Sequence, residues 1–194
     1  MSFRLSRLIV LLSLLGSMLA LNLSAAAELQ LGDLMRQLAQ TRTARASFVE
    51  QKFIGMLDKP VESSGELSFT APDQLEKRTL QPKPEAIILR GNELTLERGK
   101  RVLRASLLEF PDAAVFVESI RATLAGDQHA LEAVWRVELD GSLARWTLRL
   151  TPLASNAYVN RIRIAGVRGE VRQIEIEQHD GDRSLMNITR LSAP

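Results

Sequence analysis

The sequence contains no cysteine and only two histidines among its 194 residues. The absence of cysteine excludes disulfide bonds, iron–sulfur clusters, cysteine zinc sites and thiol catalysis, so the fold must depend on an apolar core. His129 and His179 both lie in polar, turn-like segments, where an imidazole is usually solvated. Neither histidine is predicted to carry chemistry.

Motifs for catalysis and metal binding are also missing. The sequence has no Gly-x-Ser-x-Gly elbow, no phosphate-binding glycine loop and no His-Glu-x-x-His helix. Asp180-Gly181-Asp182 offers carboxylate oxygens, but no closing glutamate of a calcium loop follows it, so a hairpin turn is favoured. We predict that the protein is not an enzyme and needs no cofactor or metal. An exported enzyme stays an alternative, which a histidine beside a carboxylate in a cleft would favour.

The first residues have the layout of a secretory signal peptide. Arg4 and Arg7 precede an apolar run over 8–23, and Ala25-Ala26-Ala27 offers a cleavage site of small residues. The run is shorter than the roughly 20 residues of a membrane-spanning helix, and no cysteine is present to carry the lipid of a lipoprotein. We therefore predict a signal peptide over 1–27 and one exported, soluble domain over 28–194 that is not lipidated.

An excess of one charge is missing once the leader is set aside. Because Arg4 and Arg7 are its only charged residues, the remaining chain has 23 basic and 23 acidic side chains. This balance disfavours nucleic acid as a partner. The cluster Arg98-Gly99-Lys100-Arg101 with Arg104 is interpreted as a hydrated turn between strands, although guanidinium groups also suit anionic headgroups.

Helical and strand periodicities alternate along the chain. Apolar residues recur at helical spacing over 31–38 and again from Pro111 to Leu124, before a stop at Gly126. Alternating polarity predicts half-buried strands at 65–70, 93–97, 135–140, 146–151, 161–164 and 173–177. Turn signals lie at Asp140-Gly141, 166–169 and Asp180-Gly181, and strand ends or edges are expected at Pro72, Pro82 and Pro84.

These elements predict an α+β, mainly β fold in which an antiparallel meander is interrupted by a central helix. Two helices have apolar faces that can cover one side of the sheet, so a curved sheet wrapped round helices fits best. The charged members of the strands project from the other side: Glu66, Glu97, Arg136, Glu138, Arg149, Arg163, Glu175 and Glu177.

Several short segments, taken in order, resemble the LolA family of outer-membrane lipoprotein carriers. In the first half they are Ala46–Lys52, Gly65–Phe69 followed by Pro72, and Gln81-Pro82 before Glu85–Leu89. In the second half they are Leu148–Asn156, Val159–Ile164, and Ile174–Gln178 with Asp180, Asp182 and Arg183. The similarity spans nearly the whole of 28–194 and depends on the order and spacing of these segments.

The resemblance implies an incomplete, half-open antiparallel β-barrel with helices that form a lid over an apolar cavity. It implies a monomeric periplasmic carrier that takes acylated lipoprotein or lipid cargo from an inner-membrane transporter to an outer-membrane acceptor. Such shielding is physically reasonable, because each methylene exposed to water costs about 0.8 kcal/mol. Strand and helix parity gives the apolar side chains that line the cavity or form ordinary core: Leu34, Leu38, Leu67, Phe69, Leu94, Leu96, Phe116, Ile120, Leu124, Trp135, Val137, Trp146, Leu148, Leu150, Ile162, Ile164, Ile174 and Ile176.

Departures from the family pattern leave alternatives open. The arginine that typically precedes the strand-ending proline, and that is implicated in holding the lid, is replaced by Ala71 before Pro72. The aromatic residues usual in the next strand are replaced by Leu75-Glu76-Lys77. Lipoprotein and free lipid therefore remain equally compatible cargoes. The alternatives are a LolA-like accessory protein that binds a non-lipoprotein lipid or polyene for an exporter, and a lipid-sensing regulatory module.

Overall fold

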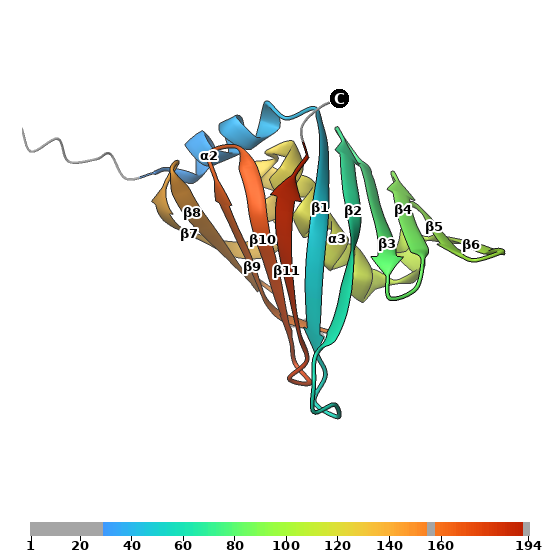
Figure 1. Cartoon of the computed structure of the whole chain (residues 1–194). Helices are drawn as coiled ribbons and strands as arrows, with labels where there is room; N and C mark the ends of the chain where they lie inside the picture. The colour runs from blue at the N-terminus through green and yellow to red at the C-terminus, as the bar shows by residue number, and fades with distance from the viewer. Residues whose placement is uncertain (1–28, 155–157, 192–194) are drawn as a thin grey trace, which may run out of the picture.

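The computed structural model of the chain describes residues 29–154 and 158–191; the predicted signal peptide over 1–27 lies outside them. Within the described residues, one antiparallel sheet has the strand order β6-β5-β4-β3-β2-β1-β11-β10-β9-β8-β7. Because β1 pairs with β11, the first and last strands lie side by side in the middle of the sheet (Figure 1). The strands are β1 (Thr43–Phe53), β2 (Val61–Thr70), β3 (Gln74–Gln81), β4 (Glu85–Arg90), β5 (Glu93–Arg98), β6 (Arg101–Ser106), β7 (Trp135–Ser142), β8 (Arg145–Pro152), β9 (Val159–Val167), β10 (Glu170–Gln178) and β11 (Arg183–Arg190).

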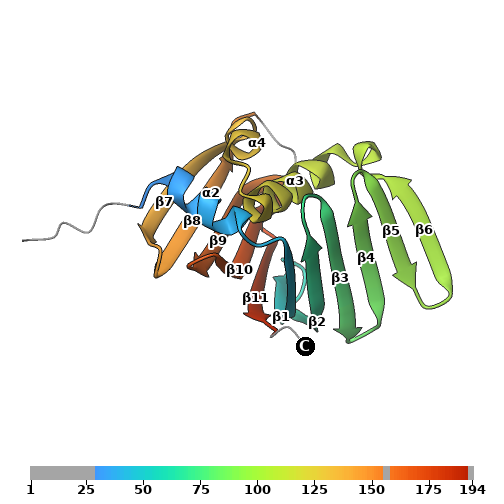
Figure 2. The same cartoon turned by 90° about the horizontal axis from the view of Figure 1, so that it is seen from above.

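The helices lie together on one face of this sheet, which we call the inner face (Figure 2). They are α2 (Leu31–Ala39), the short 3-10 helix η1 (Leu107–Glu109), α3 (Pro111–Ala125) and α4 (Gln128–Glu132). α3 begins at Pro111, whose fixed φ suits the first helical position, and ends at Gly126 with a left-handed φ of 70°. Both helices predicted from periodicity are therefore confirmed, and no helix among the described residues is long and apolar enough to span a membrane.

The apolar core lies between the helices and the inner face of β7–β10. α2 buries Leu34, Met35 and Leu38, the apolar stripe that its sequence spacing predicts. On the sheet side, directly opposed residues of neighbouring strands contribute to the same cluster, as Leu148 and Ile164 do. This end of the sheet is therefore a filled, helix-covered core.

The predicted charged residues project from the opposite, outer face, and most of them pair across strands. The Arg149 guanidinium lies 3.3 Å from the Glu138 carboxylate. Glu175 is buried on this face, because the guanidinium groups of Arg163 and Arg183 both pair with its carboxylate. The outer face is polar, as alternation predicts, but this carboxylate is covered by its partners.

The fold class is confirmed: the chain is mainly β, its sheet is antiparallel and not closed into a barrel, and β6 and β7 are the free edges of that sheet. The six predicted strands lie within β2, β5, β7, β8, β9 and β10. The predicted turn at Asp140-Gly141 is wrong, because both residues lie inside β7 and the turn follows at 143–144. Gly141 is needed in the strand instead, since a Cβ there would lie 2.2 Å from the carbonyl oxygen of Arg145.

Candidate lipid-binding face

The register of the strands places one row of residues across the open half of the inner face. Leu67 of β2 faces Lys77 of β3, which faces Ile87 of β4. Ile87 faces Leu96 of β5, and Leu96 faces Leu103 of β6. Directly opposed residues share a face of the sheet. We call Leu67, Ile87, Leu96 and Leu103 the apolar row, with Lys77 set between its first two members.

This row shares the inner face with the helices. Leu67 is opposite Ala46 of β1. Along the same side of β1, Glu50 is opposite Met186 of β11, which is opposite Ile174 in the helix-covered core. Because side chains two residues apart on a strand lie on one face, Ala46 and Glu50 fix the row on the inner face.

The apolar row is only partly covered. Leu103 is 60% exposed and Ile87 is 38% exposed, while Leu67 and Leu96 are half-buried. In the parallel row two residues nearer η1 and α3, Phe69 and Leu89 are buried, and Leu75 and Leu94 are half-buried. The row nearer the helices is therefore the better covered, and the apolar row is the more exposed of the two.

Most of the predicted lining residues lie in the helix-covered core. They come from both layers of that cluster: Leu34, Leu38, Phe116, Ile120, Trp135, Val137, Trp146, Leu148, Leu150, Ile162, Ile164, Ile174 and Ile176. Those that belong to strands lie on the inner face of the sheet. Several of them, Trp146 and Leu148 among them, are fully buried against other side chains.

The remaining predicted residues lie outside that cluster: Leu67, Phe69, Leu94, Leu96 and Leu124. Leu67 and Leu96 belong to the apolar row, whereas Phe69 is already buried. Sequence reasoning missed Ile87 and Leu103. Ile87 precedes a second isoleucine, and Leu103 follows an exposed valine, so neither strand has an alternation that marks its inner side. Only the cross-strand register assigns them to this face.

A buried ion pair adjoins the apolar row. Glu50 is 4% exposed, and its carboxylate pairs with the Lys77 ammonium. The carboxylate also accepts hydrogen bonds from the hydroxyls of Ser184 at 2.7 Å and Ser63 at 3.2 Å. The Lys77 ammonium lies 4.9 Å from the centre of the Phe48 ring. The Lys52 ammonium lies 3.9 Å from the same carboxylate. The inner face thus has an apolar row with a small cluster of paired charges beside it.

The pKa of Glu50 reflects two opposing effects. Burial of the carboxylate acts to raise its pKa, because the charged form loses hydration. The positive charge of Lys77 and the hydrogen bonds from Lys77 and Ser184 outweigh burial and lower the pKa below its ordinary value. Glu50 is therefore held in its charged form.

The other sequence candidates are placed as follows. His129 is exposed on α4 beside a hollow of about 400 Å³ that Gln128 and Glu132 also line, and His179 is exposed in the β10–β11 turn. The backbone N–H of Asp182 donates to the Asp180 carboxylate at 2.9 Å, so the predicted hairpin turn is confirmed. No group of three or more histidine, aspartate or glutamate side chains in the described part of the chain is placed to hold a metal ion.

The basic segment at 98–101 also behaves as a turn. Gly99 and Lys100 connect β5 to β6, as the interpretation of a turn between strands requires. The Nε of Arg98 donates to the carboxylate of Glu85 at 2.7 Å. The Nε of Arg104 lies 4.0 Å from the carboxylate of Glu93. This cluster is thus partly neutralised by carboxylates of neighbouring strands.

An open antiparallel sheet, with helices over one apolar face and part of that face exposed, defines a class of half-barrel that presents an apolar surface to a ligand. The chain belongs to the family described as outer membrane lipoprotein carrier protein LolA-like, whose model matches residues 23–190. The resemblance found in the sequence is therefore confirmed. Among curated proteins, none matches the chain significantly.

Solved structures with a similar course of the chain share little sequence with it. A LolA superfamily protein from Nitrosomonas europaea is 9% identical with a TM-score of 0.43, over 86% of this chain and 96% of that one. An outer membrane lipoprotein-sorting protein domain from Vibrio parahaemolyticus is 10% identical with a TM-score of 0.42, over 86% and 93%. The Mycobacterium tuberculosis lipoprotein LppX is 10% identical with a TM-score of 0.41, over 82% and 93%.

Proposed function

We propose that this protein is a periplasmic carrier that shields the acyl chains of lipoprotein or lipid cargo in transit between the inner and outer membranes. In this proposal residues 1–27 are a cleaved signal peptide, and residues 28–194 form the lipid-binding domain. A donor transporter in the inner membrane and an acceptor in the outer membrane are its partners. The carrier description of the family supports this function.

The observation that carries the proposal is the exposed apolar row. Leu103, at 60% exposed, and Ile87, at 38%, lie on the same face as half-buried Leu67 and Leu96. Covering such side chains with an acyl chain removes apolar surface of both molecules from water, at about 25 cal/mol per Å². A carrier needs this surface to be open when empty, whereas a closed core offers no place for cargo.

A matched pair of substitutions on β6 tests the site. Leu103 and Val102 are neighbours with nearly equal exposure, 60% and 57%, but they project from the inner and outer faces. We expect Leu103→Asp to weaken binding of a fluorescent fatty-acyl probe about tenfold, because a carboxylate would lie against the chain. Val102→Asp adds the same charge outside the row, so its affinity should equal that of the unmodified protein. Equal affinities for the two variants would refute the site.

The cargo itself is identified by native mass spectrometry with lipid extraction, on protein purified from the periplasm without detergent. An acylated polypeptide bound to the protein would identify lipoprotein cargo, and a bound free lipid would identify the alternative. Protein that is recovered empty and also fails to bind the fatty-acyl probe would overturn the carrier proposal.

A further inference from the structure

A charged row lies next to the apolar row, on the side away from the helices. Glu85, Arg98 and Arg101 are each two positions along their strands from the apolar-row members of β4, β5 and β6. Side chains two positions apart on a strand share a face, so these three lie on the inner face. Arg98 is directly opposite Arg101, and Lys100 lies in the turn between them. We call Glu85, Arg98, Lys100 and Arg101 the basic rim, which lies toward the end of β5 and β6 that points away from the helices (Figure 2).

The basic rim carries an excess of positive charge. Glu85 is its only carboxylate, and it pairs with Arg98, whose Nε donates to it at 2.7 Å. Lys100 and Arg101 are exposed, and neither forms an ion pair with a carboxylate among the described residues. Glu97 of β5 is close in the sequence but lies on the outer face, opposite Val102. Two cationic side chains are therefore left for an anionic ligand.

This charge lies beside the most exposed member of the apolar row. Leu103 is 60% exposed and is two residues from Arg101 on the same strand. A strand rises about 3.3 Å per residue, so the Cα atoms of the two residues are about 7 Å apart. An arginine lays its aliphatic stem along apolar surface while its guanidinium stays in water. A ligand whose acyl chain covers Leu103 can therefore place a charged group at the end of that chain against Arg101.

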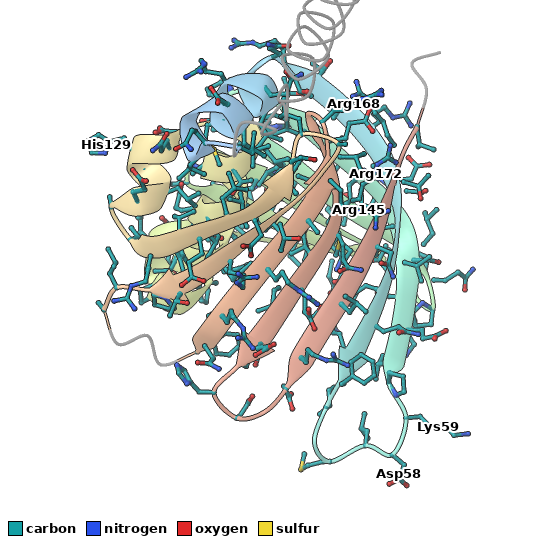
Figure 3. All side chains as sticks on the ribbon, turned by 90° about the vertical axis from the view of Figure 1, so that its left-hand side faces the viewer. Asp58, Lys59, His129, Arg145, Arg168 and Arg172 are labelled. Atoms are coloured by element: carbon teal, nitrogen blue, oxygen red, sulfur yellow. The ribbon has the colours of Figure 1, made fainter. Side chains whose placement is uncertain are left out.

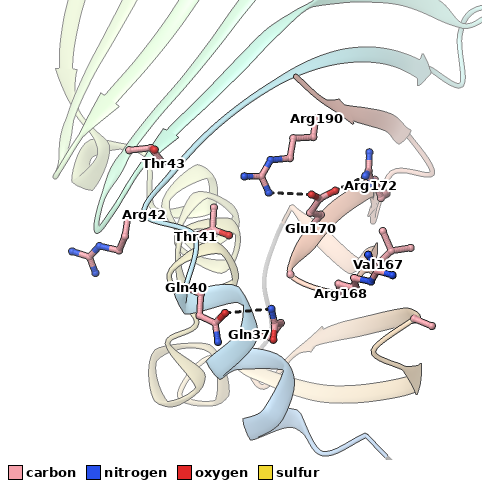
Figure 4. A pocket seen from close by; sticks show the side chains of 12 residues that line it. Gln37, Gln40, Thr41, Arg42, Thr43, Val167, Arg168, Glu170, Arg172 and Arg190 are labelled. Atoms are coloured by element: carbon pink, nitrogen blue, oxygen red, sulfur yellow. Dashed lines mark hydrogen bonds and ion pairs between the residues drawn. The ribbon is translucent and has the colours of Figure 1, made fainter. Parts of the chain in front are cut away.

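A second group of arginines lies on the other half of the sheet. Figure 3 shows Arg145, Arg168 and Arg172 together at one end of β8–β10, strands whose inner face is filled by the helix-covered core. A cleft of about 820 Å³ adjoins them. Figure 4 shows that Arg172 and Arg190 face Glu170 there, and its carboxylate pairs with both guanidinium groups. Among the described residues, only the basic rim thus sets unpaired positive charge beside the apolar row.

We propose that the cargo is an anionic phospholipid, with its acyl chain on the apolar row and its headgroup against Lys100 and Arg101 of the basic rim. This inference rests on the carrier proposal and names the class of cargo for the same site. A guanidinium group donates two parallel hydrogen bonds to phosphate oxygens, and an ammonium group adds a second positive charge. The rim favours a free phospholipid over a lipoprotein, because the acyl chains of a lipoprotein are joined to it through neutral ester and amide bonds.

Two lipids with the same palmitoyl chain test the headgroup, by competition with the fluorescent fatty-acyl probe on the full mature protein. Lysophosphatidylglycerol carries a negative charge, whereas monopalmitoylglycerol is neutral. We expect the anionic lipid to bind about tenfold more tightly, and Arg101→Gln to remove most of that preference. Arg104→Gln is the control, because Arg104 is exposed on the same strand but lies on the outer face, so this variant loses the same charge and should keep the preference. Salt should reduce the preference, since the rim is exposed.

The possible results separate this inference from the carrier proposal. Equal affinities for the two lipids would overturn the headgroup assignment and leave the carrier proposal standing. The assignment is also overturned if Arg101→Gln keeps the full preference, or if Arg104→Gln loses as much of it as Arg101→Gln. If the probe binds but neither lipid displaces it, only the phospholipid inference fails. If neither the lipids nor the probe bind, the carrier proposal fails as well.

Discussion

Glu50 is a buried carboxylate whose main partner is the Lys77 ammonium, and the more exposed Lys52 ammonium lies 3.9 Å from the same carboxylate. Transfer of a carboxylate away from water is costly unless it is paired and hydrogen-bonded. Here Lys77 supplies the opposite charge and two serine hydroxyls supply further donors. Removal of the carboxylate would leave the Lys77 ammonium, which is 23% exposed, without that partner.

We expect Glu50→Gln to lower the free energy of unfolding by about 2 kcal/mol at neutral pH. Urea unfolding followed by circular dichroism measures this difference. Glu66→Gln is the control, because Glu66 pairs with Arg45 at 3.2 Å on the exposed outer face and its loss should cost well under 1 kcal/mol. A cost at Glu50 no larger than that at Glu66 would contradict a stabilising role for the buried pair.

The same residue gives a pH dependence with a definite sign. Burial acts to raise the pKa of Glu50, but Lys77 and the hydrogen bonds to the carboxylate lower it below the ordinary 4.5. A pKa lowered by folding adds stability above the ordinary pKa, and this contribution is lost as the pH falls through the folded value. The difference between the parent protein and Glu50→Gln should therefore be full at pH 7 and shrink below about pH 4. A difference that stays constant with pH would show that ionisation of Glu50 is not its source.

At the scale of elements, the end of α3 is joined closely to α2. Gly126 has a left-handed φ of 70°, and a Cβ built there would lie 2.2 Å from the carbonyl oxygen of Met35 in α2. The N–H of Asp127 donates to the carbonyl of Ala122 at 2.8 Å and closes the helix end. The glycine thus serves both the helix stop and the close contact of two helices.

Gly126→Ala should lower the free energy of unfolding by about 3 kcal/mol. Two costs add: the alanine is strained at a left-handed φ, and its Cβ overlaps the Met35 carbonyl oxygen unless α2 moves away. Gly99 provides the comparison, since its φ is 59° but a Cβ added there would have no atom within 4 Å. Gly99→Ala should cost only about 1 kcal/mol, the strain alone. Chemical denaturation of both variants measures the two losses of unfolding free energy. Equal losses would show that the close contact with Met35 adds nothing to the cost of the Gly126 substitution.

The elements were predictable from sequence where local chemistry decides them. Helical spacing before Gly126 gave α3, and alternation gave the strands that have one wet face. Gly141 misled the turn assignment, because a glycine required by close packing within a strand looks the same as a glycine required by a turn. β6 has no alternation to detect, since Val102 and Leu103 are both exposed at an edge of the sheet. Edge strands bury neither face fully, so local polarity marks neither side.

At the scale of the whole molecule, the two halves of the sheet differ in how far they are filled. The alternation of side chains along each strand identified the inner face for residues such as Trp146 and Leu96. It could not show whether an inner residue is covered by the helices or left exposed. That difference depends on where the helices lie relative to each row. α2 and part of α3 pack on β7–β10, whereas the apolar row on β2–β6 is left partly exposed.

This asymmetry predicts a pattern of amide hydrogen exchange. Amides of β8 and β9 lie in the middle of the covered half and should exchange most slowly, because exchange there requires opening of the core. Amides of β5 and β6 should exchange faster, since these strands lie at an open edge with little apolar burial. Saturation with a fatty-acyl ligand should slow exchange in β4–β6 by about tenfold or more. The ligand binds these strands only while they are folded, so it stabilises them against the local unfolding that exchange requires.

Exchange followed by mass spectrometry, with and without ligand, checks this pattern in a single protein. Slower exchange confined to β4–β6 would place the acyl chain on the apolar row, and the Leu103→Asp variant should lose that effect while Val102→Asp retains it. If the ligand instead slowed exchange mainly in β8 and β9, cargo would have to enter the filled core. The side chains around Trp146 and Leu148 would then have to move apart, and the open row would not be the binding surface.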